Sequence, residues 1–167
     1  DVDLGKITAL REVIEANPVR TPDAVLAEKM TRLIQDTRQA GDSLGGIVEC
    51  AAVGVPAGWG DPVFDRLDPL IAHAMLAIPA TKGIEIGSGF NAVSMTGKEH
   101  NDIFEMQNGK VTTRTTHSGG IQGGISNGMP ITFRTAFKPT ATISHEQPSV
   151  NERGENVMLK VKGRHDP

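Results

Sequence analysis

The spacing of apolar and polar side chains predicts an amphipathic helix near the start of the chain, within residues 21–41. One face of this segment carries Leu26, Met30, Leu33, Ile34 and Thr37, which is the repeat expected for a helix. Thr21 is suited to cap the helix, Pro22 to occupy its first position, and Gly41 to follow its last turn. The pattern therefore predicts a helix that starts at Pro22 and ends before Gly41.

Two further segments are apolar enough to be buried. Residues 45–56 (GGIVECAAVGVP) are apolar on both faces except for Glu49, which predicts a largely buried strand. A second helix is predicted from Asp68–Pro69 to Ile78, because Pro79 cannot continue it. This helix is apolar nearly all round, which is typical of a helix that is covered on more than one side.

Short strands are predicted for much of the remaining chain. Residues 83–87 and 91–97 are strand candidates, and Asn108–Gly109 joins two further candidates in a hairpin with a type I′ turn. Residues 131–138 alternate: Ile131, Phe133 and Phe137 point one way, and Thr132, Arg134, Ala136 and Lys138 the other. Residues 156–163 alternate as well. We expect an α+β fold with antiparallel strands and a buried helix, and residues 1–167 as one partial domain without an internal linker.

Composition and charge exclude several classes of function. The net charge is −3 and basic residues do not cluster, which argues against a nucleic-acid surface as the main function. Cys50 is the single cysteine, so an internal disulfide is excluded and a reducing compartment is expected. The longest apolar stretch, residues 70–80, is far shorter than the roughly 20 residues that span a membrane. The five histidines lack metal-ligand spacing, so no metal site is predicted.

The most unusual segment is HSGGIQGGISNG, residues 117–128, with five glycines in twelve residues. It lacks the G-x-G-x-x-G spacing of a dinucleotide site and the Gly-Lys-Ser/Thr ending of a phosphate loop. Two interpretations remain at this point. The segment is either a wide turn between strands, or a loop whose bare backbone makes room for a ligand.

Two charged clusters are candidates for anion binding. Lys138 ends a predicted strand and is followed by the hydroxyls of Thr140 and Thr142, an arrangement suited to bind an anion. A solvated lysine on the surface is the alternative interpretation. In the C-terminal segment KVKGRHDP, Arg164 is suited to grip a phosphate or carboxylate, and Asp166 to act as a base or an orienting group. A polar tail is the alternative for this second cluster.

Six segments, taken in order, resemble chorismate synthase: GDSLGG (41–46), GVPAGWGDPVFDRLD (54–68), AHAMLAIPATKGIEIGSGF (72–90), GGIQGGISNG (119–128), FKPTATI (137–143) and GRHDP (163–167). The resemblance covers the chain from about Pro18 onward. His117 stands where the family often has Asn, and Ala141 where Pro or Ser is common. The Gly-Glu-Ser-His-Gly and Arg-Ser-Ser-Ala-Arg motifs of the family are not in this sequence. The resemblance therefore implies the second half of such an enzyme, truncated at both ends.

The resemblance implies a β-α-β sandwich in which antiparallel sheets pack around buried helices. It implies a lyase of the shikimate pathway that uses reduced FMN to eliminate phosphate from 5-enolpyruvylshikimate-3-phosphate, giving chorismate for aromatic amino acid biosynthesis. NADPH is associated with the family as a reductant, and the source of the reduced flavin is left open. The family also implies a cytoplasmic homotetramer, with no nucleic acid or membrane as a partner.

Site residues follow from the resemblance, motif by motif. The implied FMN contacts are Pro79, Ala80, Gly123, Lys138, Pro139, Thr140, Ala141, Thr142 and Arg164. The implied catalytic residue is Asp166, which matches the aspartate that works beside the flavin to remove the substrate hydrogen. The alternative from another class is a non-catalytic remnant of the fold that acts as a binding or assembly module. On either interpretation, we expect the isolated chain to be inactive.

Overall fold

The structure, a computed structural model, describes residues 7–161, and the chain folds as two units. The first unit consists of the described residues of Asp1–Gly45 and Lys138–Pro167, and the second of Gly46–Phe137. Among the described residues, no helix combines the length and the apolar character that crossing a membrane requires.

Two helices begin the first unit, α1 (Ile7–Glu15) and α2 (Ala24–Gln39). Helix α2 confirms the amphipathic prediction, but it begins at Ala24 because the carboxylate of Asp23, not Thr21, accepts the Leu26 N–H at 2.9 Å. Thr21 instead accepts from the amide side chain of Asn17 through its carbonyl, at 2.7 Å. Gly41 follows the helix with φ of +79°, the left-handed conformation expected there.

A hairpin completes the first unit. Strands β8 (Gln147–Val150) and β9 (Asn156–Leu159) pair antiparallel. The turn is held by Asn151, whose side-chain oxygen accepts the N–H groups of Arg153 at 2.9 Å and Glu155 at 3.0 Å. Strand β9 confirms the first part of the strand predicted over residues 156–163, whereas β8 was not predicted, since Pro148 weakened its strand pattern.

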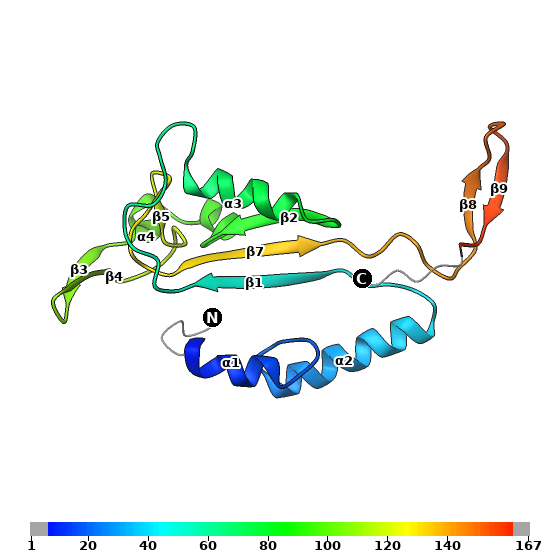
Figure 1. The fold of residues 1–167 in the computed structure, drawn as a ribbon, viewed down its shortest axis with the longest axis horizontal. Coiled ribbons are helices and arrows are strands. Elements are labelled where there is room, and N and C mark those ends of the chain that lie inside the picture. The colour runs from blue at the N-terminus through cyan, green and yellow to red at the C-terminus, as the bar shows by residue number, and fades with distance from the viewer. Residues whose placement is uncertain (1–6, 162–167) are drawn as a thin grey trace. The chain divides into compact units, whose positions relative to one another are not determined.

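The second unit is built on a three-stranded antiparallel sheet. Its strands lie side by side in the order β1 (Gly46–Ala52), β7 (Ile131–Phe137) and β2 (Thr81–Ile86) (Figure 1). The register places Thr135 opposite both Val48 and Ile84, so these three side chains share one face. Helix α3 (Leu67–Leu76) packs against β2. The buried residues Ile131, Thr135 and Thr81 form the core of this sheet.

The α+β class with antiparallel sheets is confirmed, but two burial predictions inside it are wrong. Strand β1 is not largely buried: Ile47 is 68% and Val48 is 57% exposed. Ile47 and Val48 point to opposite faces of the sheet, and within the second unit β1 contacts mainly β7 beside it, so neither side chain is well covered. Helix α3 contains no buried residue, because its contacts with β2 leave apolar side chains such as Leu70 and Leu76 exposed.

The segment between β2 and the next hairpin is helical, so the strand predicted over residues 91–97 is wrong. A 3₁₀ helix η2 (Gly89–Ser94) precedes the short helix α4 (Gly97–His100). Thr96 and Glu99 form a capping box: the Thr96 hydroxyl accepts the Glu99 N–H at 3.3 Å, and the Glu99 carboxylate accepts the Thr96 N–H at 2.7 Å. This capping box starts α4 at Gly97. Residues 91–94 of the predicted strand belong to η2, where the Asn91 N–H donates to the Ser88 carbonyl at 3.0 Å.

Two small hairpins complete the second unit. Strands β3 (Phe104–Gln107) and β4 (Lys110–Thr113) confirm the predicted hairpin, with φ of +50° at Asn108 and +75° at Gly109. Strands β5 (Ile121–Gln122) and β6 (Ile125–Ser126) lie within the glycine-rich segment and pair antiparallel. The glycine run is therefore a structured hairpin rather than an open loop.

Candidate functional site

The glycine-rich segment contains two kinds of glycine. All five have positive φ, which favours glycine over any other residue. Gly119 and Gly120 are buried, and a Cβ on either would meet backbone within 3 Å: Gly87 N for Gly119 and Pro130 O for Gly120, each at 2.5 Å. These two glycines serve close packing of backbone on backbone, so bare backbone here does not by itself indicate a ligand.

Gly123 differs from its neighbours. It is exposed at the turn of the β5–β6 hairpin, and a Cβ there would meet no atom within 4 Å. The adjacent Gly124 is buried against the Arg66 side chain, whose Cγ would lie 2.5 Å from its Cβ. Gly123 is thus the member of the run whose surroundings leave open space on the side where a side chain would stand.

A second candidate segment is the turn between α3 and β2. The Thr81 N–H donates to the Ile78 carbonyl at 3.2 Å, with Pro79 and Ala80 between them. Ala80 has φ of +69°, in the left-handed region that a residue with a side chain rarely adopts. Strained backbone of this kind is concentrated at functional sites, so the conformation of Ala80 independently marks it as a candidate site residue.

The Lys138–Thr142 segment directly follows β7 and belongs to the first unit. Its position is fixed by Ser43, whose hydroxyl donates to the Thr140 carbonyl at 2.7 Å, while the Ser144 N–H donates to the Gly41 carbonyl at 2.9 Å. The Lys138 side chain is exposed, and its ammonium donates to the Pro139 carbonyl at 3.1 Å. An exposed ammonium on an anchored backbone segment is suited to an anionic group.

The structure therefore distributes the predicted site residues over both units. Pro79, Ala80 and Gly123 belong to the second unit and Lys138–Thr142 to the first. Arg164 and Asp166 lie outside the described residues.

The most densely bonded side chain of this region, Asp102, was not among the predicted site residues. Asp102 is 6% exposed. One carboxylate oxygen accepts the Thr115 hydroxyl at 2.7 Å and the His117 N–H at 2.8 Å. The other accepts the Ser118 N–H at 2.9 Å and the Ser118 hydroxyl at 2.6 Å. Its partners lie 13 to 16 residues away in the sequence, so no local pattern could have revealed them.

These hydrogen bonds determine the charge of Asp102. Burial, the largest single influence, raises the pKa of this carboxyl. The hydrogen bonds from Ser118, Thr115 and His117 together outweigh it, so the pKa lies below its ordinary value. Asp102 is therefore ionised at neutral pH, and a buried negative charge holds the Thr115–Ser118 segment.

Two histidine rings stack beside this segment. The centroids of His100 and His117 are 5.8 Å apart, with 29° between the ring planes. The Nδ1 atom of His117 lies 3.0 Å from the Ser88 hydroxyl, and the Ser88 N–H donates to the His117 carbonyl at 2.8 Å. His117 is thereby fixed at both its ring and its backbone.

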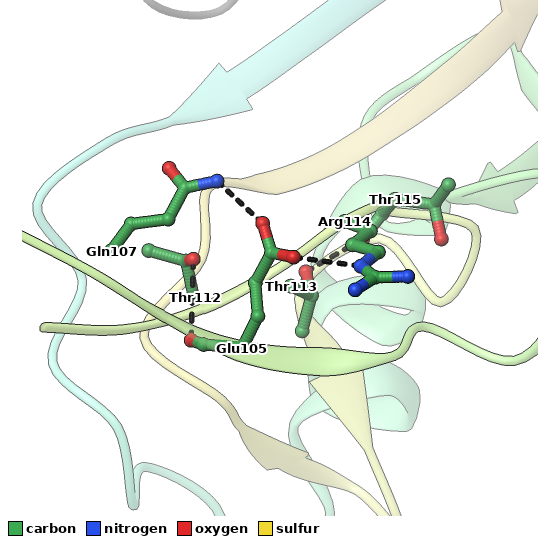
Figure 2. A network of polar contacts seen from close by, with 6 residues as sticks. All are labelled: Glu105, Gln107, Thr112, Thr113, Arg114 and Thr115. Carbon is green, nitrogen blue, oxygen red and sulfur yellow. Dashed lines mark hydrogen bonds and ion pairs between the residues drawn. The ribbon is translucent and has the colours of Figure 1, made fainter.

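A neighbouring network lies on the β3–β4 hairpin, and Figure 2 shows it at close range. The Glu105 carboxylate accepts from Arg114 Nε at 2.7 Å and from the Gln107 amide. The hydrogen bond from Arg114, and then that from Gln107, lower the pKa of Glu105. In the same network the Thr113 hydroxyl donates to the Thr115 carbonyl at 2.6 Å.

Other chemistry-bearing groups are sparse in residues 7–161. No group of three or more His, Cys, Asp or Glu side chains in this range is placed to hold a metal ion. Cys50 is half-buried on β1, and burial raises the pKa of its thiol. A neutral thiol is a weak nucleophile, so this cysteine has no sign of activation.

Comparison with known proteins identifies the fold. A family model described as chorismate synthase matches residues 2–167. A chorismate synthase from Opitutus terrae is 54% identical over 169 residues, covering 100% of this chain and 47% of that protein. One from Akkermansia muciniphila is 56% identical over 165 residues, covering 99% of this chain and 45% of that protein. A solved structure titled "Crystal Structure of Chorismate Synthase" aligns with a TM-score of 0.77 at 36% identity, covering 84% of this chain and 43% of that one.

The fold thus defines an α+β protein on antiparallel sheets, of the kind seen in that crystal structure. The chain belongs to the chorismate synthase family. It spans about half the length of the curated relatives that it matches.

Proposed function

We propose that the complete protein carrying this chain is a lyase that eliminates phosphate from 5-enolpyruvylshikimate-3-phosphate to give chorismate, in the shikimate pathway. The observation that carries the proposal is the 54–56% identity to chorismate synthases over essentially the whole chain. We further propose a cytoplasmic homotetramer, in which residues 1–167 form part of one larger domain.

The proposed cofactor is reduced FMN, held by the residues that the family resemblance indicates. Gly123 offers open space at a hairpin turn, Ala80 holds a left-handed backbone, and Lys138 presents an exposed ammonium. These features are compatible with a flat ring system that approaches backbone and with an anionic phosphate. The flavin, when bound, supplies an electron-rich ring that assists phosphate departure and takes part in hydrogen removal.

The roles of individual residues complete the proposal. Pro79, Ala80 and Gly123 line the flavin through backbone, while Lys138 through Thr142 and Arg164 hold anionic groups. Asp166 is the carboxylate that removes the substrate hydrogen beside the flavin.

The test is phosphate release from 5-enolpyruvylshikimate-3-phosphate by the complete natural protein with excess reduced FMN. Asp166→Asn should lower kcat by roughly two to four powers of ten, as expected for a lost general base. Substrate and FMN binding should change little, because Arg164 and Lys138 remain. Lys138→Ala should instead weaken binding, and Lys110→Ala, an exposed lysine on the β3–β4 hairpin, is the matched control.

Three outcomes distinguish the alternatives. Activity with these variant effects supports the proposal. Near-normal turnover of Asp166→Asn makes Asp166 a structural partner of Arg164 and removes its catalytic role. A complete protein that neither releases phosphate nor binds FMN is a non-catalytic module with this fold.

The isolated 167-residue chain should be inactive and should bind FMN weakly. It covers less than half of the relatives' length, and each lost 1.4 kcal/mol of contact energy weakens binding about tenfold. Titration of FMN against the purified chain measures this. A dissociation constant well below about 1 μM would contradict the expectation.

A further inference from the structure

Asp102 lies outside the residues that the family resemblance assigns to the flavin, yet it orders the segment that leads to one of them. Its carboxylate accepts four hydrogen bonds, all of them from Thr115, His117 and Ser118. Two of them come from backbone N–H groups, so the carboxylate fixes the path of the chain rather than a side chain alone. Gly119 follows Ser118 directly and begins the glycine run.

Backbone N–H groups of two other residues also hold this part of the chain. The Ser88 N–H donates to the His117 carbonyl at 2.8 Å, and the Thr132 N–H donates to the Gly119 carbonyl at 3.2 Å. A Cβ on Gly87 would lie 2.2 Å from the His117 carbonyl oxygen, which shows how closely these backbones approach. The entry to the glycine run is thus held by Asp102, by Ser88 after β2 and by Thr132 of β7.

Further backbone hydrogen bonds hold the rest of the glycine run up to its exposed turn. The Asn127 N–H donates to the Gly120 carbonyl at 3.0 Å, and the Ser126 N–H donates to the Trp59 carbonyl at 2.8 Å. Only the Gly123 side of the turn remains open. A binding loop that is ordered before its ligand arrives avoids the entropic cost of ordering upon binding.

We propose that Asp102 is a positioning residue for flavin binding: it clamps Thr115–Ser118 so that the glycine run presents Gly123 in its binding conformation. This inference rests on the proposed function, in which Gly123 lines the flavin. Asp102 itself does not touch the cofactor. Its effect passes through backbone that it holds, as outer-shell partners hold the ligands of a metal.

The experiment titrates oxidised FMN into the complete natural protein and its variants, following flavin fluorescence and the absorption spectrum of the bound flavin. Asp102→Asn keeps the shape but turns an NH₂ group toward hydrogen-bond donors. The FMN dissociation constant should rise about tenfold, the usual scale for loss of an outer-shell partner. The spectrum of the bound flavin should also move toward that of free FMN, and amide hydrogen exchange at His117 and Ser118 should accelerate.

Two controls separate positioning from general loss of stability. Glu105→Gln changes a nearby carboxylate that bonds Arg114 and Gln107 instead. Asn151→Ala removes the hydrogen bonds that hold the β8–β9 turn and so destabilises a hairpin of the other unit. Both should retain the wild-type FMN dissociation constant and bound-flavin spectrum. Ser118→Ala, which removes one of the four bonds, should weaken FMN about threefold and decides the matter if Asp102→Asn does not fold.

The outcomes distinguish this inference from the proposed function. If the wild-type protein does not bind FMN, the proposed function fails and the positioning role fails with it. If the wild type binds FMN and Asp102→Asn or Ser118→Ala shows the same affinity and spectrum, the positioning role alone is overturned. Equal weakening by Asn151→Ala would also overturn it, because the effect would then be one of stability.

Discussion

The hydroxyl of Ser126 accepts the backbone N–H of Trp59 at 2.8 Å and donates to the carbonyl of Pro56 at 2.7 Å. The two residues also bond through the main chain, where the Ser126 N–H donates to the Trp59 carbonyl at 2.8 Å. Ser126 is 3% exposed. One small buried side chain therefore fixes the loop that precedes α3 against the glycine-rich hairpin.

Ser126→Ala should destabilise the protein, because it leaves a backbone N–H and a backbone carbonyl without their buried partner. We expect a loss of about 1–3 kcal/mol. Trp59 is the single tryptophan, so its fluorescence reports on this loop during denaturant unfolding. Ser94→Ala, which removes an exposed hydrogen bond to the Asn91 carbonyl, should change stability by less than about 0.5 kcal/mol. Equal stabilities of these two variants would contradict the role of Ser126.

Asp102 should make the stability of the second unit depend on acid pH. Its pKa is lower in the folded protein than in the unfolded chain, where a free Asp has a value of about 3.9. A carboxylate whose pKa is lowered by folding stabilises the folded state at pH values above the pKa that it has in the unfolded chain. This stabilisation is lost as the pH falls through its pKa in the folded protein. Asp102→Asn should thus be less stable than wild type at pH 7, with the difference shrinking below about pH 4.

Thermal unfolding of both proteins between pH 7 and pH 3 measures this dependence. Glu105→Gln serves as a comparison, because that carboxylate also has a lowered pKa but is only half-buried on its hairpin. A difference between wild type and Asp102→Asn that stayed constant over this range would show that the charge of Asp102 is not what holds the segment.

Gly87 and Gly109 both have positive φ, but they should differ in their tolerance of a side chain. Gly109→Ala meets open space and should cost only the backbone strain, about 1–2 kcal/mol. Gly87→Ala places a methyl group within 3 Å of backbone atoms of His117, Ser118 and Gly119, and should cost at least about 3 kcal/mol. Denaturant midpoints of the two variants test the ranking, and a Gly87→Ala protein as stable as Gly109→Ala would refute the close approach.

Thr135→Val should be neutral or stabilising. The Thr135 hydroxyl is buried in the centre of β7 and has no hydrogen-bond partner among the residues that the structure describes. A valine of similar shape removes that unsatisfied oxygen and suits a strand, so we expect a gain of up to about 1 kcal/mol. Differential scanning calorimetry measures it. A loss of more than about 1 kcal/mol would mean that the hydroxyl has a partner in solution.

The elements that could be predicted from sequence are those specified by local chemistry. Asn108–Gly109 determined a hairpin by itself, and alternation along β7 gave the correct division of its two faces. The same logic misplaced the start of α2, because Thr21 and Asp23 are both good N-caps and only the folded chain shows which one is used. It also misread residues 91–97 as a strand, although residues 89–94 form a 3₁₀ helix and the Thr96–Glu99 capping box starts the next helix.

Burial and the candidate site could be predicted only in part, because both depend on distant contacts. The apolar pattern of β1 and α3 indicates surfaces that need cover, but not whether the described residues supply it. The glycine run was identified, yet the difference between packed Gly119 and open Gly123 required the fold. Asp102 was missed for the same reason, since its partners come from another segment of the chain.

The exposed apolar side chains of the second unit should make the isolated 167-residue chain self-associate. Ile47 and Val48 lie on edge strand β1, which has backbone groups free to pair with another strand on the side away from β7 within its unit. Exposed, apolar edges promote association, so light scattering should show a dimer or a larger species. Val48→Lys places a charge on this edge and should shift the population toward monomer. Val25→Lys changes an equally apolar exposed side chain on helix α2 and should have little effect. A monomer at high concentration, or an equal response to both lysines, would show that β1 is not the associating edge.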